Sequence, residues 1–433
     1  MNRIGLKKEE KAFETRVPVV PDHVKFLHDK HGIEFLLEPS TQRAFTEDEY
    51  LNANARILSL KGSNTSVVLG IKEMPIDFFE ENIVYIFFSH TIKGQDYNMP
   101  MLKRIMDVGA TLIDYERVID DKGRRLIFFG NWAGMAGISD TFRMLGDRLE
   151  SQGVKPNPFA DMKPTFELGG LSELKEEFAA LGRRIKEQGL PEELKPFVIG
   201  FAGYGNVSKG AQEIFDILSH EVINPEELEH IPPKSDLLYK CVFKEEHMVE
   251  PRSSSEQFDL QDYYKNGAAK YVGVFHKHVP YLTVLMNCIY WTEKYPRLVT
   301  KEFIKNHWKQ ESRRLQIVGD ISCDVEGAIE FTLDCTKANK PAFTYIINED
   351  RAEIGVVGEG PVVMAVDNLP SELPRESSTS FSETLLDFIP ALANADFTVQ
   401  FSELELPREL KDAVIVYQGK LTENYQYLSQ YIP

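Results

Sequence analysis

Short apolar runs alternate with amphipathic segments along the first third of the chain. The apolar runs predict strands, and the segments between them predict helices. We expect strands at residues 34–39, 66–73, 82–90 and 110–116, and helices at residues 46–56 and 96–109. Strands that alternate with helices form parallel sheets. The pattern therefore predicts an α/β domain in this part of the chain.

A second series of elements follows a long helical pattern that starts at Ala133. The charged helical stretch 172–195 is typical of a solvated face. Further strands are expected from Phe197 and at residues 281–291 and 314–322. The polar segment 244–269 is expected to be an excursion from the sheet. Residues 382–392 carry another helical pattern. This series predicts a second sheet.

The two series together predict an α/β fold of two Rossmann-like, doubly wound parallel-sheet domains with a cleft between them. The substrate and catalytic domain is expected at residues 1–135 plus 375–433, and the dinucleotide-binding domain at residues 136–374. A length of 433 residues agrees with this division, since domains average roughly 150 residues.

A glycine-rich turn follows the strand that starts at Phe197. Gly203 and Gly205 allow the backbone to approach a pyrophosphate, which then lies at the positive end of the next helix. We expect Asn206 or Ser208 to cap that helix, and Gly210 and Ala211 to permit tight packing of the helix on the strand. Ser208 occupies the third glycine position of the G-x-G-x-x-G pattern. The turn predicts dinucleotide binding, and the alternative is an ordinary strand–turn–helix.

Composition narrows the class of protein. The net charge of −18 argues against binding to nucleic acid or to anionic membranes. No apolar run approaches the roughly 20 residues of a membrane span, and the charged N-terminal stretch does not resemble a signal peptide. The four cysteines lack C-x-x-C spacing, so neither a zinc site nor a disulfide framework is indicated. We expect a cytoplasmic protein with no metal site.

Ionisable side chains follow three of the expected strands of the first domain, and Arg16 follows the opening strand. They are Lys72 and Glu73, then His90 with Lys93 and Gln95, then Asp114 and Glu116. Ligands of parallel sheets bind at the carboxyl ends of the strands. Such groups can move protons and hold substrate carboxylates. Each residue alone also fits a solvated loop, a structural histidine, or a surface pair of Arg16 with Glu14.

A set of motifs carries a family resemblance. ETRVPVVPDHV, LGIKEMP, FFSHTIKGQ, LIDYE, GRRLIFFGNWAGMAG, GYGNVSKGAQEIF, NCIYW, GDIS and VDNLPSELPRESS occur in this order. The chain resembles the lysine–2-oxoglutarate reductase half of aminoadipic semialdehyde synthase. It is more distantly similar to L-lysine-forming saccharopine dehydrogenase and alanine dehydrogenase. The resemblance implies an oxidoreductase that condenses L-lysine with 2-oxoglutarate and reduces the imine with a nicotinamide to saccharopine.

The resemblance also implies roles for individual residues. Lys72 and His90 match the proton-transfer pair, and Arg16 matches an arginine that holds a substrate carboxylate. Matches to the substrate lining are Glu73, Lys93, Gln95 and Glu116, and matches to the cofactor site are Gly203, Gly205, Asn206, Val207 and Asp367. For Asp367 a helix cap is an equally good interpretation. The sequence does not assign acid and base within the Lys72–His90 pair.

The sequence gives little indication of whether the cofactor is NAD(H) or NADP(H). NAD-binding folds usually place an acidic residue about 20 residues after the glycine turn. In this region Asn224 fits a helix cap, and Glu226 and Glu227 fit the first helical turn, so no free carboxylate is evident. The resemblance favours NADP(H) over NAD(H).

Two other functions stay open. One is a related amino-acid or opine dehydrogenase of the alanine dehydrogenase type, and the other is a non-catalytic nucleotide-binding regulatory protein. The intact Arg16, Lys72 and His90 argue against the regulatory protein. The expected partners are small molecules (L-lysine, 2-oxoglutarate and saccharopine). Association with further copies of the chain stays open.

Overall fold

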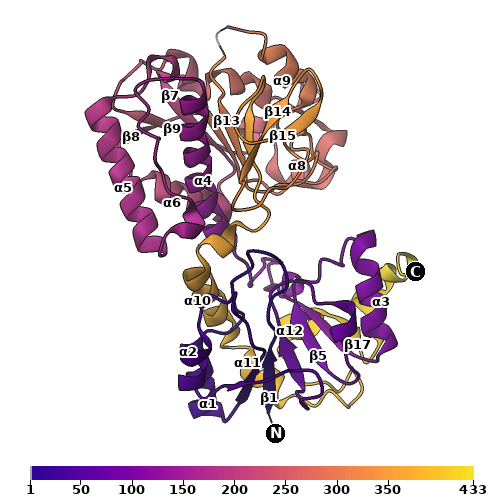
Figure 1. Cartoon of the computed structure of the whole chain (residues 1–433). Coiled ribbons are helices and arrows are strands. Elements are labelled where there is room, and N and C mark those ends of the chain that lie inside the picture. The colour runs from indigo at the N-terminus through magenta and orange to yellow at the C-terminus, as the bar shows by residue number, and fades with distance from the viewer. Residues whose placement is uncertain (1, 312) are drawn as a thin grey trace. The chain divides into compact units, whose positions relative to one another are not determined.

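The chain folds into two compact units. The structure is a computed structural model, and it describes residues 2–311 and 313–433. Unit 1 comprises the residues up to Phe129 together with Pro374–Pro433, and unit 2 comprises Gly130–Leu373. Each unit has its own eight-stranded, mainly parallel sheet (Figure 1).

The sheet of unit 1 has the strand order β18-β17-β6-β5-β4-β1-β2-β3. The strands are β1 (Arg3–Leu6), β2 (Glu34–Leu37), β3 (Arg56–Ile57), β4 (Val67–Leu69), β5 (Val84–Phe87), β6 (Thr111–Asp114), β17 (Val414–Tyr417) and β18 (Lys420–Leu421). β1 to β6 pair in parallel, and the hairpin of β17 and β18 adds two antiparallel strands beside β6. The four strands predicted for this part of the chain are confirmed as β2, β4, β5 and β6.

Helices cover both faces of this sheet. On one face lie α1 (Pro21–His31), α2 (Glu47–Asn52), α10 (Pro374–Leu385), α11 (Ile389–Asn394) and α12 (Arg408–Asp412). On the other face lie α3 (Met99–Asp107) and the 3₁₀ helix η11 (Glu423–Gln430). Val67 and Val68 of β4 belong to opposite apolar clusters, because successive strand residues point to opposite faces. The doubly wound arrangement is as predicted, with α2 and α3 confirming the two predicted helices.

The sheet of unit 2 has the order β15-β14-β16-β13-β12-β7-β9-β8. The strands are β7 (Phe197–Ala202), β8 (His220–Ile223), β9 (Leu238–Phe243), β12 (Val284–Asn287), β13 (Ile317–Asp320), β14 (Ala342–Ile346), β15 (Arg351–Ile354) and β16 (Val362–Met364). The strands β16, β13, β12, β7, β9 and β8 pair in parallel with one another. β14 pairs antiparallel with β16, and β15 pairs antiparallel with β14. The predicted strands are confirmed as β7, β12 and β13, whereas β9, β14, β15 and β16 were not predicted.

The two faces of this second sheet are also covered. α4 (Gly130–Ser151), α5 (Leu171–Gln188) and α6 (Asn206–Phe215) pack on one face. The other face carries α7 (Glu245–Met248), β10 (Val249–Pro251), α8 (Leu260–Asn266), β11 (Tyr271–Gly273) and α9 (Lys301–His307). Met248, Val249 and Tyr263 are buried in that second cluster. The polar segment 244–269 is therefore a cover for the sheet of unit 2.

The long helix α4 begins at Gly130, ahead of the predicted Ala133, and packs closely on α6. An added Cβ at Gly210 would lie 2.0 Å from the carbonyl oxygen of Asn131, and one at Gly134 would lie 2.0 Å from that of Val207. The expected role of Gly210 in helix–strand packing was wrong, because its close contact is with another helix.

The predicted capping of α6 was also wrong. Gly205 occupies the N-cap position and no side chain caps the helix. Ser208 is buried, and its hydroxyl accepts a hydrogen bond from Nε2 of Gln212 at 2.8 Å. The first amides of α6 are left open toward the glycine turn. No helix in the described part of the chain is long and apolar enough to cross a membrane.

Candidate functional site

A polar cluster lies where β4, β5 and β6 of unit 1 end. These strands are parallel neighbours, so their carboxyl ends lie at one edge of the sheet. Lys72 and Glu73 follow β4, His90 follows β5, and Asp114 ends β6. The sequence prediction of ionisable groups after three adjacent strands agrees with this topology.

Lys72 is half-buried beside other charged groups. Burial lowers the pKa of its ammonium, and the positive charge of Arg16 lowers it further, while Glu14 and Glu73 oppose the change. A lysine with a lowered pKa can exist in the neutral form that accepts a proton. The structure thus brings Lys72, Arg16 and Glu73 into one electrostatic group.

Arg16 is held in a buried ion pair. Its Nε lies 2.8 Å from Oε1 of Glu14 and its Nη2 lies 2.5 Å from Oε2, with Arg16 4% exposed and Glu14 1% exposed. The guanidinium also stacks over the ring of Phe129, 4.1 Å from its centroid. Arg16 and Glu14 therefore form the ion pair that was considered, but the pair is buried and does not lie on the surface. It fixes the orientation of the guanidinium.

Glu9, which was not a predicted site residue, supports the same loop. Its carboxylate accepts hydrogen bonds from the backbone N–H groups of Ile71, at 2.7 Å, and Lys72, at 3.0 Å. Burial raises the pKa of Glu9 to about 8, and the neighbouring charge of Glu14 adds to the effect. Glu9 follows β1, so the rule that chemistry gathers at strand ends could have found it.

Glu73 and His90 form a direct pair. Nδ1 of His90 lies 2.5 Å from Oε1 of Glu73. Burial alone would raise the pKa of Glu73, but the hydrogen bond and charge of the His90 ring outweigh burial and lower it to about 2. Glu73 therefore stays ionised near neutral pH and fixes the orientation of the ring, which leaves Nε2 as the second site for a proton.

The loop that carries His90 is fastened on two sides. Asp114 accepts hydrogen bonds from the backbone N–H of Ser89, at 3.1 Å, and from its hydroxyl. Nδ2 of Asn98 donates to the carbonyl oxygens of Ser89, at 3.1 Å, and His90, at 3.3 Å. His90 has φ +48, a left-handed conformation that is uncommon outside glycine. Asp114 and Asn98 thus hold a strained loop that presents the imidazole.

The remaining predicted substrate residues lie at the rim of this cluster. Lys93 is exposed, and its backbone N–H donates to Oε1 of Gln95 at 3.2 Å. Glu116 accepts an ion pair from Nη2 of Arg125 at 2.5 Å. These contacts join Glu116 to Arg125 and the backbone of Lys93 to Gln95.

A second site lies at the glycine turn of unit 2. β7 ends at Ala202, Gly203 has φ +95, and α6 begins at Asn206. β7 lies between β9 and β12, at the point where the strand order reverses and open α/β sheets bind ligands. A cavity of about 370 Å³ opens there, lined by Gly203, Tyr204, Gly205, Glu245, Met248, Tyr263, Tyr264, Cys288, Ile289, Tyr290 and Tyr295. Of the predicted cofactor residues, Gly203 and Gly205 line this cavity, and Asn206 and Val207 form the first turn of α6.

Glu245 is the acidic group of this cavity. The hydroxyl of Tyr264 donates to Oε1 of Glu245 at 2.6 Å. Glu245 follows β9, and β9 rather than β8 is the neighbour of β7. The region around Asn224 follows β8 at the outer edge, where Asn224 occupies the expected N-cap position and Glu226 and Glu227 lie in the first helical turn. A count of residues from the glycine turn reaches β8 before β9, so Glu245 was not among the predicted cofactor residues.

Asp367 follows β16 and is exposed. Its backbone N–H donates to the carbonyl oxygen of Thr336 at 3.3 Å. The N-cap position of the following 3₁₀ helix η10 (Leu369–Glu372) belongs to Asn368 instead, so the cap interpretation does not describe Asp367. Among the described residues, no group of three or more His, Cys, Asp or Glu side chains could hold a metal ion.

Two family models match the chain. The alanine dehydrogenase/PNT N-terminal domain matches residues 5–136, and the C-terminal domain of the same family matches residues 274–424. The chain belongs to the alanine dehydrogenase/PNT family. Its fold resembles that of two solved structures. They are an L-alanine dehydrogenase (TM-score 0.61, 18% identity, 100% of both chains) and a transhydrogenase from Sinorhizobium meliloti (TM-score 0.55, 14% identity, 97% of this chain and 98% of the other).

The sequence relatives of this alanine dehydrogenase/PNT protein confirm the predicted resemblance. The alpha-aminoadipic semialdehyde synthase of Arabidopsis thaliana is 35% identical over 96% of this chain and 40% of the relative. The mitochondrial synthase of Rattus norvegicus is 31% identical over 99% and 47%. The saccharopine dehydrogenase (NAD(+), L-lysine-forming) of Emericella nidulans is 29% identical over 97% of both chains. The chain spans less than half of the synthases that it matches.

Proposed function

We propose that the protein condenses L-lysine with 2-oxoglutarate and reduces the resulting imine with a nicotinamide to saccharopine. The observation that carries the proposal is the group of Lys72, Glu73, His90 and Arg16 at one sheet edge of unit 1. The relatives named for this chemistry match nearly the whole chain.

The reaction needs two proton transfers and the binding of carboxylates. The ε-ammonium of lysine must lose a proton before its nitrogen attacks the oxo carbon, and the carbinolamine must lose water to give the imine. A neutral Lys72 can take the first proton, and His90, oriented by the ionised Glu73, can deliver a proton to the departing hydroxyl. Arg16 binds a carboxylate, because a guanidinium pairs with it in a planar, bidentate geometry.

The cavity at the glycine turn is proposed to hold the dinucleotide. Gly203 and Gly205 leave room for a pyrophosphate, and the amides of Asn206 and Val207 begin α6 beside it. The nicotinamide, when bound, supplies the hydride that reduces the imine carbon. Asp367 is retained as a proposed residue of the nicotinamide end.

We further propose that Glu245 selects NAD(H). A carboxylate at the end of the strand beside β7 accepts hydrogen bonds from the ribose 2′-hydroxyl and repels a 2′-phosphate. This preference is opposite to the NADP(H) preference that the resemblance implied. The direct test compares kcat/KM for NADH and NADPH in the wild type, Glu245→Gln and the exposed neighbour Glu246→Gln.

Glu245→Gln should lower the ratio of NADH to NADPH efficiency by about tenfold or more, since a charge-assisted hydrogen bond contributes roughly 1.5–3 kcal/mol. Glu246→Gln should leave the ratio unchanged. An enzyme that prefers NADPH, with a ratio insensitive to Glu245, would refute the assignment.

The reaction itself is tested by following nicotinamide oxidation with L-lysine plus 2-oxoglutarate. Alanine, ornithine, pyruvate and ammonia replace the substrates one at a time. Turnover that requires lysine and 2-oxoglutarate together supports the proposal. Turnover with alanine, or with pyruvate and ammonia, would assign an alanine dehydrogenase-type reaction instead.

A further inference from the structure

Two cysteines meet just beyond the carboxyl end of β13 in unit 2. Cys323 lies three residues after the end of β13, and Cys335 lies in the segment that leads to β14. Sγ of Cys335 lies 3.2 Å from the carbonyl oxygen of Cys323, and the two thiols also interact directly. Both cysteines are partly exposed, so a small oxidant can reach them.

The two thiols differ in acidity. The hydrogen bond from Cys323 lowers the pKa of the Cys335 thiol, although burial and nearby aspartates oppose the change. The same interaction and burial raise the pKa of Cys323. The other cysteines are buried, and burial raises the pKa of Cys241 to about 12 and that of Cys288 well above its usual value. Cys335 is therefore the thiol of this chain that most readily becomes a nucleophilic thiolate.

The backbone at Cys323 is held in an unusual conformation. Its φ is +44, which costs a non-glycine residue free energy. The backbone N–H of Cys323 donates to Oδ1 of Asp320 at 3.3 Å, and the hydroxyl of Thr332 donates to Oδ2 at 2.6 Å. Asp320 thus fixes both sides of the loop between the cysteines.

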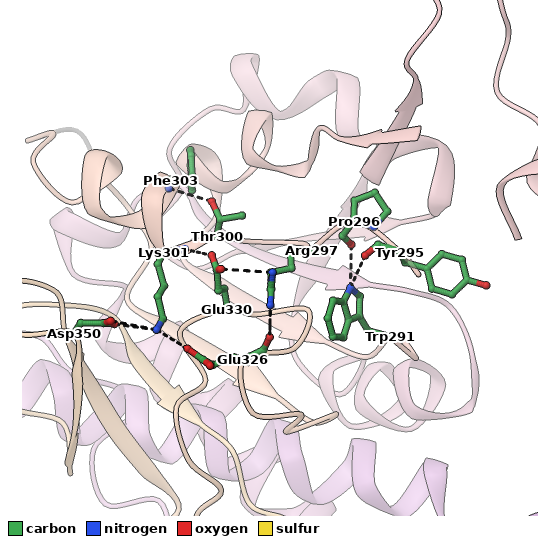
Figure 2. A network of polar contacts seen from close by, with 10 residues as sticks. All are labelled: Trp291, Tyr295, Pro296, Arg297, Thr300, Lys301, Phe303, Glu326, Glu330 and Asp350. Atoms are coloured by element: carbon green, nitrogen blue, oxygen red, sulfur yellow. Dashed lines mark hydrogen bonds and ion pairs between the residues drawn. The ribbon is translucent and has the colours of Figure 1, made fainter. Parts of the chain in front are cut away.

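The middle of this loop is anchored to the segment that borders the cavity. Figure 2 shows Lys301 between Glu326, at 2.7 Å, and Asp350, and Arg297 donating to the carbonyl oxygen of Glu326 at 3.0 Å. In the same network, Nε1 of Trp291 donates to the carbonyl oxygen of Tyr295 at 3.1 Å. Because Tyr295 lines the cavity and Arg297 follows it two residues later in the chain, the segment 291–297 connects the cavity wall with the loop.

We propose that Cys323 and Cys335 form a reversible intramolecular disulfide, so that the loop between them is a thiol–disulfide switch. The proposed oxidant is a low-molecular-weight disulfide such as glutathione disulfide. The Cys335 thiolate attacks one sulfur of the oxidant and releases one glutathione thiolate. Cys323 then loses its proton to solvent, attacks the Cys335 sulfur and releases the second glutathione. Two electrons pass from the protein sulfurs to two glutathione sulfurs, and the oxidant is reduced.

The disulfide replaces the contact of Cys335 with the Cys323 carbonyl and fixes the loop at the end of β13. This loop adjoins Asp320, whose Oδ1 accepts from Nδ2 of Asn287 at 2.8 Å at the end of β12. Cys288, next in the chain, lines the cavity. We therefore expect oxidation to weaken dinucleotide binding, a consequence that rests on the proposed function.

The test equilibrates the full chain with glutathione and glutathione disulfide in a series of ratios. After alkylation, peptide mass spectrometry locates the disulfide, and thiols are counted under denaturing conditions. The wild type should lose two thiols and yield a linked pair of Cys323 and Cys335 peptides, and dithiothreitol should restore both thiols. The count does not depend on activity, so its outcome is separate from that of the proposed function.

Two single variants complete the test. Cys323→Ser should stop at a mixed disulfide of Cys335 with glutathione, whereas Cys335→Ser should react much more slowly. Four free thiols in the wild type at every ratio, or a linkage that involves Cys241 or Cys288, would overturn the proposal. Oxidation that forms the predicted linkage but leaves NADH affinity unchanged would confirm the disulfide and refute its effect on the cavity.

Discussion

Glu9 should make unit 1 lose stability as the pH rises. Its pKa in the folded protein is raised from 4.5 to about 8 by burial and by Glu14. Between these values the folded chain binds a proton that the unfolded chain does not bind. The contribution of this proton to the folding stability is therefore fully present below about pH 4.5 and is lost as the pH rises through about 8.

The size of the effect follows from that shift. A change from 4.5 to about 8 sets a ceiling of about 5 kcal/mol, at roughly 1.4 kcal/mol per pH unit. Glu9 is only half-buried, so solvent screening reduces the expected value to about 1–2 kcal/mol. Glu9→Gln keeps the shape and remains neutral. The wild type should lose about 1–2 kcal/mol of folding stability between pH 5 and pH 9 that the variant does not lose.

The assay must report on unit 1. All three tryptophans (Trp132, Trp291 and Trp308) lie in unit 2, so fluorescence reports on the other unit. Amide hydrogen exchange of peptides from β1 and β4 measures the opening free energy directly. Glu10→Gln is the matched control, because the hydrogen bond from Lys7 lowers the pKa of Glu10, which is opposite in direction to the shift of Glu9. Equal pH dependence in the wild type and Glu9→Gln would refute the burial argument.

The remaining predictions concern catalysis and packing. Lys72→Met and His90→Gln should each lower kcat by about 10²–10⁴-fold with near-normal dinucleotide affinity; unchanged turnover in both variants would contradict the proton-transfer assignment. Arg16→Lys should raise KM for the oxo acid more than it lowers kcat, because the bidentate geometry is lost; an effect confined to dinucleotide affinity would refute its placement. Gly134→Ala should destabilise unit 2 by about 1–3 kcal/mol in thermal unfolding followed by tryptophan fluorescence, because the new Cβ would lie 2.0 Å from the carbonyl oxygen of Val207; an unchanged Tm would show that α4 and α6 can separate without cost.

Local patterns predicted the parts of the fold that depend on local physics. The strand before Gly203 is uniformly buried, and parallel strands covered on both faces read as continuous apolar runs. Ionisable residues after β4, β5 and β6 could be grouped because parallel strands end at a common edge. Lys72, Glu73 and His90 were found in this way.

Features that depend on strand order could not be predicted in the same way. Glu245 was missed because β8 pairs at the outer edge of β9, and a count of residues from the glycine turn therefore reaches β8 first. Gly210 was assigned to a contact with a strand because the sequence shows only that the residue is small. It does not show which neighbouring element packs against it. The Cys323–Cys335 contact was missed because spacing says nothing about two loops that fold against the same strand end.

The C-terminal hairpin of β17 and β18 has a consequence for how the protein is made. β17 pairs with β6, so the sheet of unit 1 incorporates residues that the ribosome adds some 300 positions after β6. Unit 2 is one continuous stretch, Gly130–Leu373. During synthesis the middle of the chain can therefore complete its sheet while the N-terminal segment still waits for its last strands. Ribosome-bound chains that stop before Val414 should protect unit 2 from protease and leave unit 1 open to cleavage.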